Sequence, residues 1–178
     1  LPSLDDFNAF YENVSTLKET LVIPLTQSIE EVWKTNVNSK RRNMIRKAEK
    51  SDVIIKSLGI DQIALFYKYY KSANSKYGLF CQSKDFFIDL LNSTKNIKFE
   101  ILFAYIKEEP IGGIVIVYDK DYAFYWLGVA IPSKNYGQGE LLQWEAIKKV
   151  KTYGCKYYDL CYIDEKKLPH IHKFKKVK

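Results

Sequence analysis

The sequence lacks the features of membrane-spanning, secreted and disulfide-stabilised proteins. No stretch reaches the roughly 18 consecutive apolar residues that a membrane helix needs, and the N-terminus lacks the basic-then-apolar pattern of a secretion signal. The 3 cysteines leave one unpaired and form no C-x-x-C motif, which argues against a disulfide framework or a redox motif. We therefore expect a soluble, cytoplasmic protein without a transmembrane segment.

Repeats, low-complexity linkers and familiar catalytic clusters are also missing. The only 2 histidines, His170 and His172, have metal-like spacing but no third ligand nearby, so we expect no metal site. No Ser-His-Asp or Cys-His arrangement points to a covalent acyl-enzyme. A length of 178 residues suits one domain with a proper core, so we expect a single domain over 1–178.

Aromatic residues and positive charge are abundant. Hydrophobic residues make up 47%, with 14 Tyr and 10 Phe, which excludes disorder and favours a fold that contains a sheet. The net charge of +7 suits an anionic partner, such as a nucleic acid, a sugar nucleotide or a coenzyme. A lysine-rich surface without a ligand explains the charge equally well.

Periodicity predicts helices in the first half of the chain and strands in the second. Ser28 and Glu31 form a capping box after a short edge strand at 21–25, and a basic helix follows at 39–50. Amphipathic helices are expected from Asp61 and from Ser83. From residue 98 three strands follow in an antiparallel meander, with turns at 109–110 and 119–121. A helix from near Gly139 to Gly154 and a last strand at 156–163 complete the pattern.

A glycine-bearing loop, KNYGQG at 134–139, connects the third meander strand to the following helix. Glycines before a helix let an anion approach unpaired backbone N–H groups, so Lys134, Gly137 and Gly139 are candidates for a phosphate loop. A simple turn explains two glycines as well. The spacing Lys134-x-x-Gly137-x-Gly139 resembles the pyrophosphate loop of GNAT acyltransferases, with Lys in place of the usual first Arg or Gln.

The order of elements also resembles the GNAT fold. The resemblance implies an α/β (α+β) fold with a mixed, mostly antiparallel sheet flanked by helices. It also implies that the third meander strand, at 122–131, separates from its neighbour and exposes backbone groups to an acyl donor.

Three segments together resemble the second GNAT-like domain of Fem-type aminoacyltransferases, which build peptidoglycan cross-bridges. The segments are RRNMIRKAEKSDV from Arg41, FYKYYKSANSKYGLF at 66–80, and GCKYYDL at 154–160 with HKFKK at 172–176. The resemblance implies transfer of an amino acid from aminoacyl-tRNA to the stem-peptide amine of a UDP-linked or lipid-linked peptidoglycan precursor, without a cofactor. It also implies an excerpt of a two-domain protein lacking its N-terminal GNAT-like domain, with residues 1–20 as a leading helix or linker, and a place in the cytoplasm or at the inner face of the membrane.

Site residues follow from the Fem resemblance. Phe174 and Lys175 match a catalytic pair in which the ring stacks on the terminal adenosine and the ammonium steadies charge on the departing ribose oxygen. Such a cation helps the transition state most, because negative charge develops there. The other implied substrate-binding residues are Lys76, Tyr122, Phe124, Tyr125, Trp126 and Arg42. Alternation along a strand places Tyr122, Phe124 and Trp126 on one face and Tyr125 on the other.

Several alternatives stay open. A coenzyme A-dependent N-acyltransferase would use acetyl-CoA or another acyl-CoA at the glycine loop, and a non-catalytic module would bind RNA or another partner. Basic residues of the 39–50 helix could form a stripe for RNA phosphates, or only a solvated face: Arg41, Arg42, Arg46 and Lys47. Asp159 and Asp164 are both candidates for a general base, and a carboxylate of the acceptor could serve instead.

Overall fold

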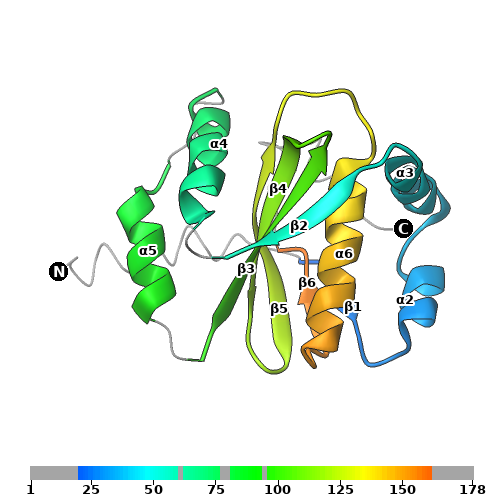
Figure 1. Ribbon diagram of the computed structural model, residues 1–178. Coiled ribbons are helices and arrows are strands. Elements are labelled where there is room, and N and C mark those ends of the chain that lie inside the picture. Colours follow the sequence, from blue (N-terminus) through cyan, green and yellow to red (C-terminus); the bar gives the residue numbers. More distant parts are fainter. Residues whose placement is uncertain (1–19, 60–61, 77–80, 94–95, 162–178) are drawn as a thin grey trace.

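The computed structural model describes residues 20–59, 62–76, 81–93 and 96–161, and these form three layers (Figure 1). A six-stranded sheet lies in the middle, in the order β1-β6-β5-β4-β3-β2. The strands are β1 (Val22–Pro24), β2 (Ile54–Leu58), β3 (Lys98–Ile106), β4 (Glu109–Tyr118), β5 (Tyr122–Ala130) and β6 (Tyr157–Asp159). All neighbours are antiparallel except β5 and β6, so the predicted mixed, mostly antiparallel α/β fold is confirmed.

Helices cover the two faces of the sheet unequally. The helices are α2 (Ile29–Thr35), α3 (Ser39–Lys50), α4 (Ile63–Lys76), α5 (Lys84–Ser93) and α6 (Gln138–Thr152). Figure 1 shows α4 and α5 on one face, and α6 with α2 and α3 beside it on the other. Each face therefore has its own hydrophobic core, one around α6 and Tyr158 and one around Phe66, Phe87 and Phe103.

Local signals in the sequence explain where the helices begin. The Glu31 amide donates to Ser28 Oγ at 3.2 Å, as the capping box predicts, and the Phe86 amide donates to Ser83 Oγ at 3.1 Å. Helix α6 carries apolar side chains on most of its turns and buries seven of its 15 residues. It crosses from β5 to the parallel strand β6, as parallel neighbours require.

Three features of the structure differ from the predictions. The first meander turn lies at Lys107 and Glu108, both with positive φ, instead of at 109–110. Strand β2 was not predicted; it pairs with β3 as an edge strand. Strand β6 ends at Asp159 instead of continuing to 163, because Cys161 turns into a left-handed conformation (φ 57°) and its amide donates to the Asp159 carboxylate.

Candidate functional site

Strands β5 and β6 separate after three residue pairs. The pairing runs from Tyr122 with Tyr157 to Phe124 with Asp159; β6 then ends, while β5 continues to Ala130. Residues 125–130 of β5 therefore turn one row of backbone groups away from the sheet ladder. Such groups can pair with an extended ligand, so the opening is the first part of the candidate site.

A β-bulge lies beside this opening. Ile116 of β4 pairs with Tyr125 and Val115 pairs with Leu127, so Trp126 is an extra residue in β5. The Trp126 ring packs on the α4–α5 face, 5.4 and 6.0 Å from the ring centroids of Phe87 and Phe99. Bulges change the direction of side chains and often adjoin active sites.

The predicted division of β5 aromatics between two faces is confirmed. Trp126 belongs to the core on the α4–α5 face, whereas Tyr125 packs on the α6 face. Burial raises the pKa of Tyr125 to about 12. A Cβ on Gly128 would lie 2.0 Å from the Tyr125 hydroxyl, so glycine is needed to admit this ring. Tyr125 thus has a packing role, and its substrate-binding role stays a prediction.

Three neighbouring rings form an exposed aromatic platform, which we define as Tyr122, Phe124 and Tyr157. The Tyr122 centroid is 4.8 Å from that of Phe124 and 5.6 Å from that of Tyr157. Phe124 and Tyr157 are each 40% exposed, although both are large aromatic side chains. Pairing of β5 with β6 creates the platform at the start of the opening. Tyr157 was missed in the sequence, because its proximity to Tyr122 depends on a parallel pairing between distant segments.

Asp159 lies at the edge of the platform and is only 6% exposed. Its Oδ1 accepts hydrogen bonds from the Thr20 hydroxyl and, at 2.7 Å, from the Cys161 amide. Its Oδ2 lies 3.4 Å from the Tyr122 hydroxyl. Partial burial, together with the Asp159 charge, raises the pKa of Tyr122. Of the two predicted base candidates, Asp159 is thus at the strand opening, and Asp164 lies outside the described residues.

The glycine loop is packed against α3. Gly137 has a positive φ of 87°, and a Cβ there would lie 2.2 Å from the Met44 carbonyl oxygen. Lys47 Nζ donates to the Asn135 carbonyl at 2.6 Å, which holds the loop to the same helix. Gly137 is therefore explained by a turn and a close backbone approach.

Side chains of the loop already bind its amides. The Tyr136 amide donates to Gln138 Oε1 and the Gly137 amide to Asn135 Oδ1, both at 3.0 Å. Glu140 adds a negative charge in the first turn of α6, where an anion would otherwise be favoured. Exposed Lys134 lies 5.9 Å from the ring centroid of Tyr136. These residues fit a coenzyme A pyrophosphate poorly, because two of the loop amides already have partners and Glu140 adds negative charge at the helix start.

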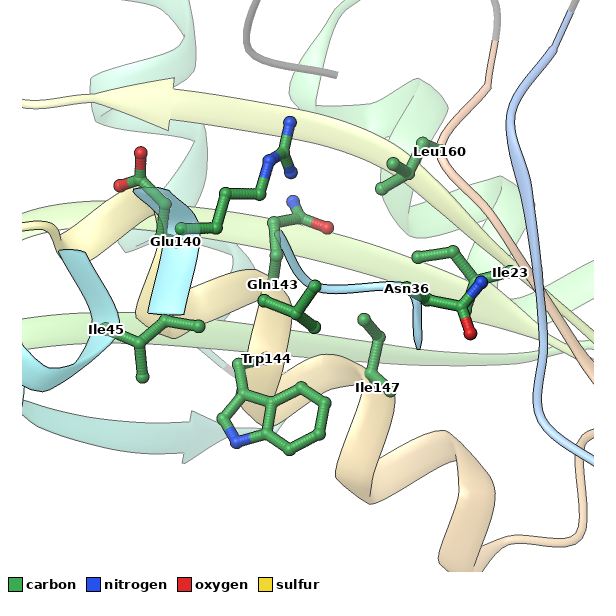
Figure 2. A pocket seen from close by; sticks show the side chains of 10 residues that line it. Ile23, Asn36, Ile45, Glu140, Gln143, Trp144, Ile147 and Leu160 are labelled. Carbon is green, nitrogen blue, oxygen red and sulfur yellow. The ribbon is translucent and has the colours of Figure 1, made fainter. Parts of the chain in front are cut away.

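A small cavity lies between α3, α6 and β1 (Figure 2). Its volume is about 20 Å³, which suits a single water molecule. Glu140, Gln143 and Arg41 line it, and Gln143 Oε1 accepts a hydrogen bond from the buried Tyr158 hydroxyl at 2.7 Å. Burial lowers the pKa of Arg41, an effect that the Glu140 charge opposes. Arg41 therefore faces the interior at this point.

The predicted RNA stripe on α3 is partly used for packing. The Arg42 guanidinium donates to the carbonyls of Trp33, Lys34 and Val37. Arg46 lies 5.9 Å from the Trp33 ring centroid. With Arg41 turned inward and Lys47 bound to the loop, the stripe is less continuous than its spacing predicts. The substrate-binding role of Arg42 stays a prediction.

The remaining predicted site residues lie at the end of α4 or outside the described residues. Lys76 is exposed at the end of α4. Phe174 and Lys175, like His170 and His172, lie outside the described residues. Within the described ranges no group of three or more His, Cys, Asp and Glu side chains could hold a metal ion. None of the described helices is long and apolar enough to cross a membrane.

Comparison with solved structures supports the fold. The chain is similar to FemX, with a TM-score of 0.69 and 11% identity, over 82% of this chain and 53% of that chain. It is also similar to L-PGS from Bacillus licheniformis (TM-score 0.58, 12% identity, 82% and 46% covered). A conserved Bacteroides thetaiotaomicron protein of unknown function gives a TM-score of 0.57 at 10% identity, with 87% and 57% covered. The chain spans about half the length of these structures, and at such identities the likeness concerns the fold alone.

Sequence comparison identifies the family. No curated protein matches the chain. The family model described as an acetyltransferase (GNAT) domain matches residues 35–176. The predicted GNAT-like fold is thus confirmed, and the resemblance to Fem-type enzymes is supported in fold by FemX. The separation of β5 and β6 agrees with this match. Because the model covers residues 35–176, the chain belongs to the acetyltransferase (GNAT) domain family.

Proposed function

We propose that the chain is part of an aminoacyltransferase that moves an amino acid from aminoacyl-tRNA to the stem-peptide amine of a peptidoglycan precursor. Membership of the GNAT family and the strand opening support acyl transfer. The likeness to FemX in fold and the sequence segments that resemble those of Fem-type enzymes favour the aminoacyl donor. The acceptor would carry a UDP-linked or lipid-linked muropeptide.

One observation carries the choice of donor: the glycine loop is packed against α3, and two of its amides are already bound within the loop. A pyrophosphate needs open backbone amides and surroundings free of negative charge. Here the Met44 carbonyl stands against Gly137, two amides are bound by side chains, and Glu140 is nearby. A donor with an ester-linked acyl group and no pyrophosphate at this loop avoids all three obstacles.

The reaction requires little beyond positioning. The acceptor amine attacks the ester carbonyl, the C–N bond forms, and the C–O bond breaks with its electron pair on the ribose oxygen. Because negative charge develops first on the carbonyl oxygen and then on the ribose oxygen, a nearby cation stabilises the transition state. We assign that role to Lys175, with Phe174 stacked on the adenosine, from the Fem resemblance.

We further propose that a second GNAT-like domain precedes this one in the whole protein, which acts in the cytoplasm or at the inner face of the membrane. The match to FemX, which covers 53% of the FemX chain, supports this proposal. If the acceptor lies between two domains, the chain alone binds the donor and transfers slowly.

Acetyl-CoA dependence is the second candidate, because the matching family model is that of an acetyltransferase domain. The third is a module that binds RNA without catalysis. It predicts salt-sensitive RNA binding that survives Lys175→Ala, with no transfer.

A paired titration tests the choice. The chain is titrated with acetyl-CoA and with a non-hydrolysable aminoacyl acceptor-stem RNA, each at two salt concentrations. We expect binding of the RNA, weakened by Phe174→Ala, and no saturable binding of acetyl-CoA. Tight acetyl-CoA binding that Lys134→Ala weakens would contradict the proposal and favour the second candidate.

A further inference from the structure

We propose that the aromatic platform and Asp159 form a binding site for a primary ammonium group. In the proposed function, on which the identity of the ligand rests, this group is the acceptor amine before it loses a proton. The site joins Tyr122 and Phe124 of β5 to Tyr157 and Asp159 of β6, at the point where the two strands separate.

The platform offers exposed ring surface to a cation. The three rings adjoin one another at centroid distances of 4.8 and 5.6 Å, and two of them are 40% exposed. Helices α4 and α5 cover the same face of the sheet, but they pack over β3, β4 and the far part of β5. Cations bind over aromatic rings within about 6 Å of the ring centroid.

The Asp159 carboxylate supplies the opposite charge. Its Oδ1 is committed to the Thr20 hydroxyl and the Cys161 amide, whereas Oδ2 has only the long 3.4 Å contact with Tyr122. Among the ion pairs of the described residues, none involves Asp159. A partly desolvated carboxylate binds an ammonium donor more strongly than a solvated one does.

A second tyrosine–carboxylate pair in the same protein shows what completes such a cluster. Tyr153 donates to Glu100 Oε2 at 2.9 Å and stacks on Tyr118, with ring centroids 5.0 Å apart. There the cation is built in, because Lys149 Nζ lies 2.5 Å from Glu100 Oε1. The platform has the rings and the carboxylate without such a lysine among the described residues, and we assign its cation to a ligand.

The position suits the chemistry of the proposed reaction. An ammonium must lose a proton before its nitrogen can attack an acyl carbon. Asp159 Oδ2 accepts that first proton and later releases it to solvent. The second proton, which the nitrogen loses after the C–N bond forms, goes to the departing ribose oxygen. The opening between β5 and β6 places the acyl group beside the platform.

Binding of a lysine derivative tests this site without any acyl donor. The chain is titrated with Nα-acetyl-lysine amide and, as a matched control, Nα-acetyl-norleucine amide, which replaces the ammonium group by a methyl group. Chemical-shift changes in ¹H–¹⁵N spectra give each Kd. We expect the lysine probe to shift the amides of residues 122–124 and 157–159 and to bind at least about tenfold more tightly than the norleucine probe.

Variants separate the platform from general surface effects. Asp159→Asn and Tyr157→Leu should each weaken lysine-probe binding about tenfold, whereas Tyr157→Phe keeps the ring and most of the affinity. Tyr153→Leu removes an equally exposed tyrosine beside a carboxylate that already has its lysine, and should change nothing. Because Tyr157 is exposed, its variants should fold. They therefore test the site even if Asp159→Asn fails to fold.

The outcomes distinguish this inference from the proposed function. Equal affinity for both probes, or unchanged affinity in Tyr157→Leu, would overturn the ammonium site. If the lysine probe binds as expected but no aminoacyl transfer occurs, the site stands and the proposed function fails. If transfer occurs with an acceptor KM that Tyr157→Leu leaves unchanged, the function stands and the site fails.

Discussion

At the scale of single residues, Gly137 has the most demanding environment in the glycine loop. Its φ is positive and the Met44 carbonyl occupies the place of a side chain. We expect Gly137→Ala to lower the free energy of unfolding by about 2–4 kcal/mol, from a strained backbone and a steric clash. Urea unfolding measures the change.

Gly139 provides the matched control for this prediction. It lies in the first turn of α6 without a positive φ, so Gly139→Ala should be neutral or stabilising by up to about 1 kcal/mol. Equal stability of Gly137→Ala and the unsubstituted chain would show that α3 does not press on the loop.

Residue spacing identified the glycines as candidate loop residues but did not show why glycine is needed there. The pattern Lys134-x-x-Gly137-x-Gly139 suits both a phosphate loop and a turn, and only the backbone of α3, some 90 residues away in sequence, separates the two. The same limit applies to Asp159, whose neighbours Thr20 and Tyr122 come from distant segments. Local patterns identify candidate residues, whereas long-range pairing decides which of them meet.

At the scale of elements, Arg42 connects α3 to the end of α2. Its guanidinium binds three carbonyls, two of which come from the last turn of α2. We expect Arg42→Ala to cost about 1–3 kcal/mol of stability, because hydrogen bonds to a charged group are lost and carbonyls are left unpaired. Thermal or urea unfolding checks this.

Lys40→Ala is the control for Arg42→Ala, since it removes a charge from the same helix at an exposed position. Comparing the two variants in RNA binding separates structure from contact. If Arg42 also binds RNA, its variant weakens binding more than Lys40→Ala does and reduces the salt dependence. An Arg42→Ala chain as stable as the original would contradict the connecting role.

Most elements followed from sequence, and the exceptions have physical causes. The meander, α6 and the edge position of β1, which contains Pro24, match their predictions. The turn at Lys107 and Glu108 requires positive φ at both residues, yet neither is the glycine or asparagine that usually signals it. Strand β2 is short, with Ile54 exposed, so it lacks a clear alternation of buried and exposed residues.

At the scale of the whole molecule, tyrosine ionisation should destabilise the fold in alkaline solution. Burial raises the pKa values of Tyr118, Tyr125 and Tyr153 to about 12 each, with nearby negative charge adding to the effect at Tyr118 and Tyr153. The unfolded chain loses these protons near pH of about 10, before the folded chain does. Stability is therefore fully present below that pH and falls as pH rises towards about 12.

Urea unfolding between about pH 8 and pH 11 measures this loss. Tyr125→Phe removes one of the ionisable groups, so its stability should decline less steeply over the same range than that of the unsubstituted chain. Parallel curves for the two proteins would show that Tyr125 ionises alike in the folded and unfolded chains.

The pairing of β1 with β6 has a consequence for how the chain acquires its structure during synthesis. Val22 pairs with Asp159, so a strand near the start of the described chain waits for one made more than a hundred residues later. Closing so long a loop is slow, and a nascent chain can complete this edge only after β6 has left the ribosome. The meander and α6 can form first, which makes the ammonium site among the last parts of the molecule to assemble.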